Sequence, residues 1–152
     1  MKLDKFYMAA ALKEAAIAFD ADEVPVGAVI VHKGKVIAKA HNQIKLLKDP
    51  TAHAEMIAIT QAAAHLASER LLDAELYVTI EPCAMCAGAL VLARIKRVCF
   101  GAPDPRTGAF GSALDINKKK LNHTIDVTKG VMEEDCALLM KEFFKGKRSR
   151  RE

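Results

Sequence analysis

Two cysteines three positions apart, Cys83 and Cys86, are the side chains of this 152-residue chain with the clearest metal-binding spacing. They follow the apolar, β-branched run at residues 76–80, which predicts a buried strand, and Pro82, which suits the first turn of a helix. Residues three apart share one face of a helix, and the unpaired N–H groups of its first turn favour thiolates. The stretch therefore predicts half of a tetrahedral zinc site, although a redox pair or two core cysteines also fit this spacing.

His53 and Glu55 form a second group, just after Pro50, which interrupts regular secondary structure. Residues 53–66 predict a helix, because they are rich in alanine and their apolar positions recur at helical spacing. Neighbours on one helical face are three or four positions apart. His53 and Glu55 can therefore face one pocket only if His53 stands at the irregular entry to the helix.

One imidazole and two thiolates give three protein ligands and leave a fourth position open, which is the pattern of catalytic zinc. Such a metal lowers the pKa of a bound water towards neutrality. Glu55 would then be a carboxylate beside that water, not a ligand, and able to carry protons. The set predicts one Zn²⁺ per chain, held by His53, Cys83 and Cys86, and hydrolysis at an electron-poor carbon with loss of an amine.

Length and composition predict a single domain over residues 1–152, with 51% hydrophobic residues and a net charge of +4. No apolar run reaches the length of a membrane span, and the N-terminus lacks the hydrophobic region of a signal peptide, so we expect a cytoplasmic protein. Phe143 and Phe144 precede a basic tail at about residues 145–152. Aromatic and basic residues together suit a nucleic acid, although for a tail taken alone a frayed, solubilising terminus is the better explanation.

The rest of the pattern alternates between helices and strands. In the first helix, Phe6, Ala10 and Ile17 are expected on the apolar face, and Met8, Leu12 and Ala15 are expected to extend it into the core. We expect helices at residues 4–19, 53–66, 83–93 and 131–145, and strands at residues 26–31, 36–42, 75–80, 95–100 and 124–128. A strand–helix–strand crossover makes its two strands parallel, so this order predicts an α/β sheet with helices on its faces and metal ligands at helix starts.

Three polar residues outside the metal group are candidates for substrate contacts. Asn42 ends a strand, where its amide could read a base edge or cap the turn. Asp104 and Arg106 lie in a loop at residues 101–111. Arg106 could bind a phosphate and Asp104 could accept from a ribose 2′-OH, or both could belong to a solvated turn.

The paired stretches at residues 53–55 (HAE) and 82–86 (PCAMC) resemble the H-x-E…P-C-x-x-C signature of the zinc-dependent nucleobase deaminases. Over nearly the whole chain the sequence is similar to the bacterial tRNA adenosine deaminases. The stretches that carry this similarity are residues 23–29 (EVPVGAV), 40–42 (AHN), 49–56 (DPTAHAEM), 76–89 (LYVTIEPCAMCAGA), 100–102 (FGA), 107–108 (TG), 111–112 (GS), 121–123 (LNH) and 143–144 (FF).

The resemblance implies a cytidine-deaminase-like fold, a three-layer α/β/α structure with a five-stranded mixed sheet. It also implies a homodimer that binds a tRNA anticodon stem-loop of the tRNA-Arg ACG class and converts adenosine to inosine at wobble position 34. In that class a zinc-bound hydroxide attacks C6 of the base and the signature glutamate, here Glu55, shuttles protons.

The resemblance further assigns roles to particular residues. It implies zinc ligation by His53, Cys83 and Cys86, and substrate binding by Asn42, Ala54, Asp104, Arg106 and Phe144. Arg106 stands where the family pattern has lysine, and the two side chains share a charge but differ in hydrogen-bond geometry.

Two other functions are compatible with the same metal group. One is a zinc deaminase of a free base or nucleoside, such as guanine or cytosine, against which the basic tail argues. The other is a non-catalytic, zinc-stabilised RNA-binding module, against which Glu55 argues, because a purely structural metal needs no carboxylate beside an open position.

Overall fold

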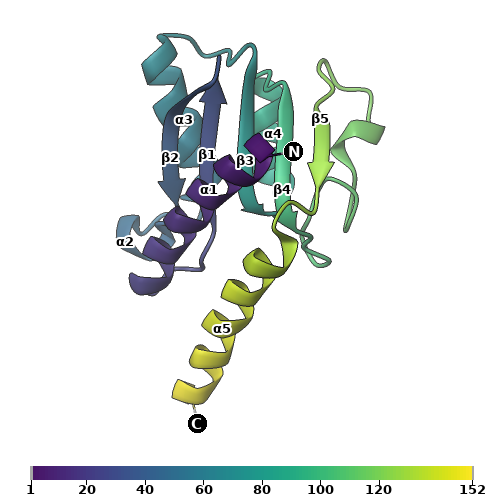
Figure 1. The fold of residues 1–152 in the computed structure, drawn as a ribbon. Coiled ribbons are helices and arrows are strands. Elements are labelled where there is room, and N and C mark those ends of the chain that lie inside the picture. The colour runs from purple at the N-terminus through teal and green to yellow at the C-terminus, as the bar shows by residue number, and fades with distance from the viewer. Residues whose placement is uncertain (1, 152) are drawn as a thin grey trace.

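The structure, a computed structural model, describes residues 2–151, with side chains up to residue 149. Met1 and Glu152, the outermost residues of the predicted domain and tail, lie outside the described residues. The helices are α1 (Lys2–Asp20), α2 (Ile44–Leu47), α3 (Ala54–Leu66), α4 (Ala84–Leu92) and α5 (Glu133–Arg151), with a short 3₁₀ turn at Ile116–Lys118. The strands are β1 (Gly27–His32), β2 (Lys35–His41), β3 (Ala74–Ile80), β4 (Arg97–Ala102) and β5 (Asp126–Lys129) (Figure 1).

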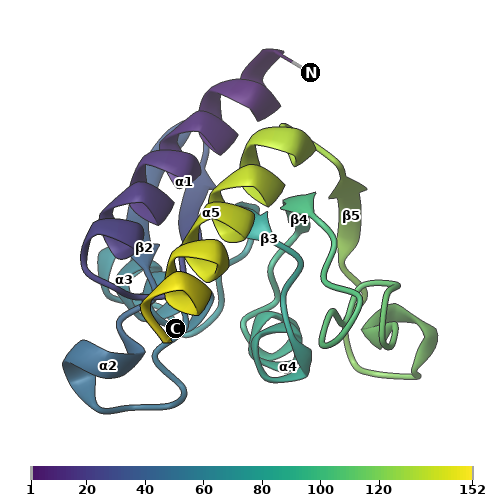
Figure 2. The same cartoon turned by 90° about the horizontal axis from the view of Figure 1, so that it is seen from below.

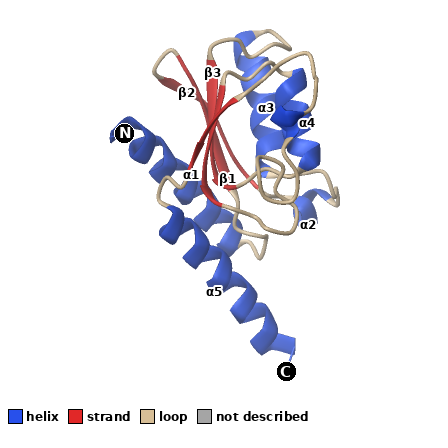
Figure 3. Cartoon of the chain, turned by 90° about the vertical axis from the view of Figure 1, so that its right-hand side faces the viewer, coloured by secondary structure: helices blue, strands red, loops and turns tan. Residues whose placement is uncertain are grey.

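Within the described chain the strands form one five-stranded mixed sheet in the order β2-β1-β3-β4-β5. β1 runs antiparallel to β2 and β3, whereas β4 runs parallel to β3 and β5. Helices α1 and α5 cover one face of the sheet, and α3 and α4 cover the other (Figures 2 and 3). The predicted three-layer α/β/α fold with a five-stranded mixed sheet is confirmed.

The β1–β2 hairpin turns through two residues with positive φ, Lys33 (φ 50°) and Gly34 (φ 77°). Two left-handed residues give the hairpin turn that matches the right-handed twist of strands. At the other end of β1, α1 packs directly on the sheet, since a Cβ at Gly27 would lie 1.9 Å from the carbonyl oxygen of Ala11. Only glycine allows this approach.

The apolar face of α1 differs in part from the prediction. Met8 and Ala15 are buried, as predicted, but Phe6 and Ile17 are exposed. Ala11 and Ala18 complete the buried line along the helix with Met8 and Ala15. These positions are three or four apart and are mostly alanine, because the close approach to β1 leaves no room for larger side chains.

The C-terminal helix also differs from the prediction, which ended it at residue 145. Helix α5 continues to Arg151, and its second half extends past the sheet (Figure 1). Lysine and arginine are good helix formers, and acidic residues fill the first turn of α5 while basic ones fill its end, which complements the helix dipole. The basic stretch is therefore the end of a helix rather than a frayed tail.

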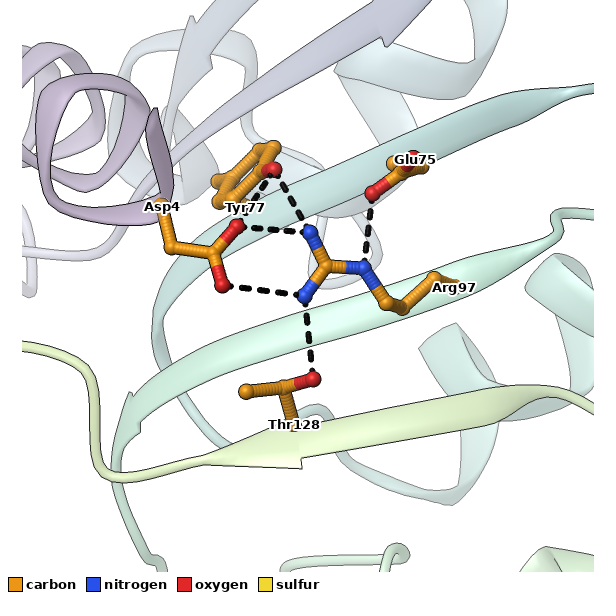
Figure 4. Close-up of polar contacts among 5 residues, drawn as sticks. All are labelled: Asp4, Glu75, Tyr77, Arg97 and Thr128. Atoms are coloured by element: carbon orange, nitrogen blue, oxygen red, sulfur yellow. Dashed lines mark hydrogen bonds and ion pairs between the residues drawn. The ribbon is translucent and has the colours of Figure 1, made fainter. Parts of the chain in front are cut away.

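Arg97, at the start of β4, links four elements through one guanidinium group (Figure 4). It donates hydrogen bonds to Asp4 of α1 at 2.7 and 3.2 Å, to Glu75 and Tyr77 of β3 at 2.6 and 2.7 Å, and to Thr128 of β5 at 2.9 Å. This network lies at the amino end of the parallel strands. The opposite, carboxyl end is where sites in such sheets form.

Candidate active site

The metal-binding group assembles from two helix starts at the carboxyl end of β3. Nδ1 of His53 lies 3.7 Å from Sγ of Cys83 and 3.5 Å from Sγ of Cys86, and all three donor atoms lie within 4.8 Å of one another. Zinc-type bonds of about 2.0–2.3 Å at tetrahedral angles put neighbouring N and S ligands about 3.6 Å apart. The three side chains therefore already have the spacing of a tetrahedral imidazole–thiolate metal site.

Both helix starts hold their ligand residue in extended backbone. His53 is the N-cap of α3 (φ −72°, ψ 150°) and Cys83 is the N-cap of α4 (φ −76°, ψ 176°). Cys86 follows in the first turn of α4 and is fully buried. The prediction that His53 occupies the irregular entry to its helix is confirmed, and it explains how His53 and Glu55 share one pocket.

The charges of the group depend on one another. A hydrogen bond from Cys86, followed by one from His53, lowers the pKa of Cys83 to about 4. The same contact with Cys83, followed by burial, raises the pKa of Cys86, and the contact of His53 with Cys83 raises the pKa of the imidazole. The two sulfurs thus share one proton. A bound cation is what allows both to be thiolates.

Glu55 is a buried carboxylic acid beside this group. Burial raises its pKa to about 7, and its carboxyl group lies close enough to the Cys86 thiol for each to shift the pKa of the other. A carboxyl group that titrates near neutral pH can both take up and release a proton. The position of Glu55 suits proton transfer beside a metal.

Asn42 supports the helix that carries His53. Its Oδ1 atom accepts a 2.7 Å hydrogen bond from the backbone N–H of Ala54, and both residues are buried. His53 makes no side-chain cap of its own. The amide nitrogen of Asn42 makes no hydrogen bond with any residue in the described part of the chain, yet it is not fully enclosed. Asn42 thus caps a helix with one end of its amide and keeps the other available.

The loop after β4 brings Asp104 and Arg106 to different places. The Asp104 carboxylate accepts from the backbone N–H groups of Arg106 (3.1 Å) and Thr107 (3.2 Å) and from the Thr107 hydroxyl (2.8 Å). Both its oxygens therefore order the loop. The exposed Arg106 points to a groove that also includes Phe144 of α5. The structure brings together Arg106 and Phe144, which the sequence analysis selected separately.

This groove has a volume of about 780 Å³ and lies between the end of α1, α2, the loop after β4 and α5. The residues that line it are Asp22, Glu23, Val24, Ile44, Lys45, Arg106, Met140, Lys141, Phe143, Phe144, Lys147 and Arg148. The Asp22 carboxylate pairs with the Nζ atoms of Lys45 and Lys147, each at 2.9 Å, and so links α2 to α5 across the groove. The lining combines five cationic side chains with two phenylalanines.

The sequence analysis missed the roles of two buried carboxylates, Glu23 and Glu81. Glu23 accepts from the backbone N–H groups of Lys45 and Leu46 at 2.9–3.1 Å and thereby holds α2, which was predicted as loop. Glu81 accepts from the loop after β4. Each acid lies next to an apolar run and close to a proline, which predicts that its side chain is buried. A buried carboxylate requires several hydrogen-bond donors, so this position in the sequence could have indicated that each acid holds a neighbouring segment.

No helix between residues 2 and 151 combines the length and the apolar character needed to cross a membrane.

Comparisons with known proteins agree over nearly the full chain. The model of the MafB19-like deaminase family matches residues 3–148. The tRNA-specific adenosine deaminase of Bacillus subtilis (strain 168) is 44% identical over 152 residues, which cover 99% of this chain and 94% of that protein. That of Aquifex aeolicus (strain VF5) is 49% identical over 142 residues, or 93% of each. A solved chain from studies of A-to-I editing by tRNA:A34 deaminases at the wobble position of transfer RNA has a TM-score of 0.86 and 45% identity, covering 88% of this chain and 98% of the solved one.

Proposed function

We propose that this chain, which belongs to the family of tRNA-specific adenosine deaminases, converts adenosine to inosine at wobble position 34 of a tRNA anticodon. The observation that carries the proposal is a buried proton carrier, Glu55, beside three donor atoms with tetrahedral spacing. A structural metal site would not need that acid. The reaction consumes adenosine and water and releases inosine and ammonia.

The metal that fits this site is Zn²⁺, because two sulfurs and one imidazole nitrogen are its preferred donors. His53, Cys83 and Cys86 would hold it, one ion per chain. When bound, zinc supplies an acidified water at the fourth position. The charge of two thiolates and one neutral imidazole then balances that of the ion, so the site can be buried at little electrostatic cost.

Glu55 carries the protons of the reaction. It accepts one proton from the attacking water and delivers it to N1 of the purine ring. It then accepts the second proton from the hydroxyl group now on C6 and delivers it to the amino group, which leaves as ammonia. Its raised pKa, about 7, suits both directions of transfer at neutral pH. The burial of Glu55 excludes bulk water from this exchange.

Substrate contacts outside the metal group are also part of the proposal. The available amide nitrogen of Asn42 would donate to an acceptor on the base, and the backbone at Ala54 would line the same pocket. The groove, with Arg106 and Phe144, would hold the anticodon loop, since cationic and aromatic side chains suit phosphates and unstacked bases. Asp104 would act there mainly by ordering the loop, with a ribose 2′-OH as its partner in the complex.

The state of assembly and the location follow from the same proposal. We propose a homodimer, and two large apolar side chains that the single chain leaves exposed fit this proposal, Leu46 of α2 at 70% and Leu92 of α4 at 78%. A tRNA substrate implies a cytoplasmic location. Analytical ultracentrifugation would test the dimer, and a monomer at micromolar concentration would contradict it.

The experiment that tests the function is inosine formation in an unmodified tRNA with an ACG anticodon, using zinc-loaded protein and its Glu55→Ala variant. We expect inosine at position 34 from the wild type and a loss of at least about 100-fold in the variant, with zinc content unchanged. Ammonia release from free guanine, cytosine and adenosine is measured in parallel. Turnover of a free base without inosine in tRNA would contradict the proposal, and so would zinc and RNA binding without any turnover.

A further inference from the structure

We propose that the side chain of Glu81 is a positioning residue that fixes the loop at residues 103–112 between the metal group and the groove. The proposal rests on the proposed function, because it concerns how the loop presents the RNA substrate to that metal group. Among the described residues, the hydrogen bonds of the Glu81 side chain go to this loop and not to the metal donors, and Glu81 does not line the groove. It acts through the loop.

The Glu81 carboxylate is the hub of this loop. It accepts hydrogen bonds from the backbone N–H groups of Asp104 (3.1 Å), Phe110 (2.9 Å) and Ser112 (3.2 Å), and from the Ser112 hydroxyl. Glu81 is only 3% exposed. A charge is buried at this depth only where several donors converge on it, and here all of them come from one segment without regular secondary structure.

The same segment touches the metal-binding stretch through its backbone. Gly108 forms an antiparallel bridge with Cys83, and the N–H of Ala109 donates to the Pro82 carbonyl at 2.8 Å. A Cβ at Gly108 would lie 2.3–2.5 Å from the carboxyl atoms of Glu81. The loop therefore packs against Glu81 on one side and a metal ligand on the other, and a Cβ at Gly108 would displace the Glu81 carboxyl group from its donors.

The far side of the loop reaches the groove. Asp104, whose N–H is held by Glu81, holds the backbone of Arg106 with its own carboxylate. Arg106 then lines the groove with Phe144. The chain of contacts from Cys83 to Arg106 thus sets the position of a phosphate-binding side chain relative to the reacting base. A shift of about 1 Å in such positioning costs up to about 100-fold in rate or binding.

Two variants and one control test this role. Glu81→Gln replaces an acceptor oxygen by an amide that faces N–H donors, and Ser112→Ala removes a single contact in case the first variant does not fold. Asp4→Asn serves as the control, because it weakens the Arg97 network at the opposite end of the sheet and so destabilises the protein without touching the loop. Each protein is assayed as the zinc-loaded full chain.

We expect Glu81→Gln to retain one zinc per chain and to raise the KM for an anticodon stem-loop RNA by about tenfold, with kcat nearly unchanged. Hydrogen exchange of the amides of Asp104, Phe110 and Ser112 should accelerate. Ser112→Ala should show the same pattern with smaller changes. Asp4→Asn should lower the unfolding midpoint and leave KM and these amides as in the wild type.

The proposal is overturned if the three amides keep their wild-type exchange rates in Glu81→Gln. It is also overturned if KM rises equally in Asp4→Asn, which would mark a general loss of stability, or if zinc is lost, which would place Glu81 in support of the metal. Should the wild type form no inosine, the proposed function fails by itself. RNA affinity by fluorescence anisotropy and the amide exchange then still decide whether Glu81 positions the loop.

Discussion

Oδ1 of Asn42 accepts a 2.7 Å hydrogen bond from the backbone N–H of Ala54, so the residue after β2 caps the helix that carries Glu55 and follows His53. One amide group therefore serves two purposes. Its oxygen accepts from the first N–H of α3, and we propose that its nitrogen donates to the substrate. Mutation can separate the role of the amide oxygen from that of the amide nitrogen.

Asn42→Ala removes both ends, whereas Asn42→Asp keeps the acceptor and removes the donor. We expect Asn42→Ala to lose about 1–2 kcal/mol of unfolding free energy, because the buried Ala54 N–H is left unpaired, and to bind zinc more weakly. Asn42→Asp should retain stability and zinc but lose deamination activity. Urea unfolding, zinc analysis and inosine formation measure the three effects. Equal activity in Asn42→Asp and the wild type would show that the amide nitrogen does not contact the base.

Cys86→Ala tests the metal assignment against Cys99→Ala, since both cysteines are completely buried and only Cys86 belongs to the metal group. A ligand present at 100 times its dissociation constant stabilises a protein by about 3 kcal/mol. We expect this zinc-dependent gain in the wild type and in Cys99→Ala, and its absence in Cys86→Ala. Unfolding is followed with and without added zinc. An equal gain in both variants would exclude Cys86 as a ligand.

The Asp4–Arg97 ion pair gives a pH dependence of stability. Its hydrogen bond with Arg97 holds the pKa of Asp4 below the usual 3.8. A carboxylate whose pKa is lowered by folding stabilises the protein above its unfolded pKa, and this contribution is lost as the pH falls below that value. The pair is partly exposed, so we expect Asp4→Asn to cost about 1 kcal/mol at pH 7.

The difference in unfolding free energy between the wild type and Asp4→Asn should shrink as the pH falls below 3.8 and then through the lowered pKa of folded Asp4. Because the comparison uses one substitution, protonation of the metal ligands affects both proteins alike. Urea unfolding of both proteins at a series of pH values measures this difference in unfolding free energy. A difference that is constant from pH 7 to pH 2 would show that the charge of Asp4 contributes nothing.

Lys147 and Arg148 test the role of the groove in RNA binding. If each contacts one phosphate, their joint replacement by glutamine should flatten the slope of log affinity against log salt by about 1.4 for a single-stranded loop, and weaken binding at low salt. Lys5→Gln, which removes the charge of an exposed lysine at the far end of α1, serves as the control and should keep the wild-type slope. Fluorescence anisotropy at several salt concentrations gives the slopes. The same slope in all three proteins would exclude the groove as a phosphate site.

Short stretches of sequence determined much of the candidate site and part of the fold. The spacing of Cys83 and Cys86 after an apolar strand, and of His53 and Glu55 after a proline, was enough to predict the ligands, the proton carrier and the helix starts that present them. The parallel pairing of β3 and β4 followed from the helix between them, and the structure agrees. These features depend on local periodicity and on the geometry of a helix N-terminus, which a few neighbouring residues set.

Only the tertiary structure decided which distant groups meet. Phe110 donates to Glu81 from 29 positions away, and Ala54 donates to Asn42 from 12 positions away. The meeting of Arg106 with Phe144 depends on α5 continuing past the sheet. A buried carboxylate or amide in a sequence signals that it needs partners, because leaving it unpaired costs several kcal/mol, about 2–7 for an amide or hydroxyl. Which loop supplies these partners depends on how the whole chain packs, and the periodicity of the sequence does not indicate this packing.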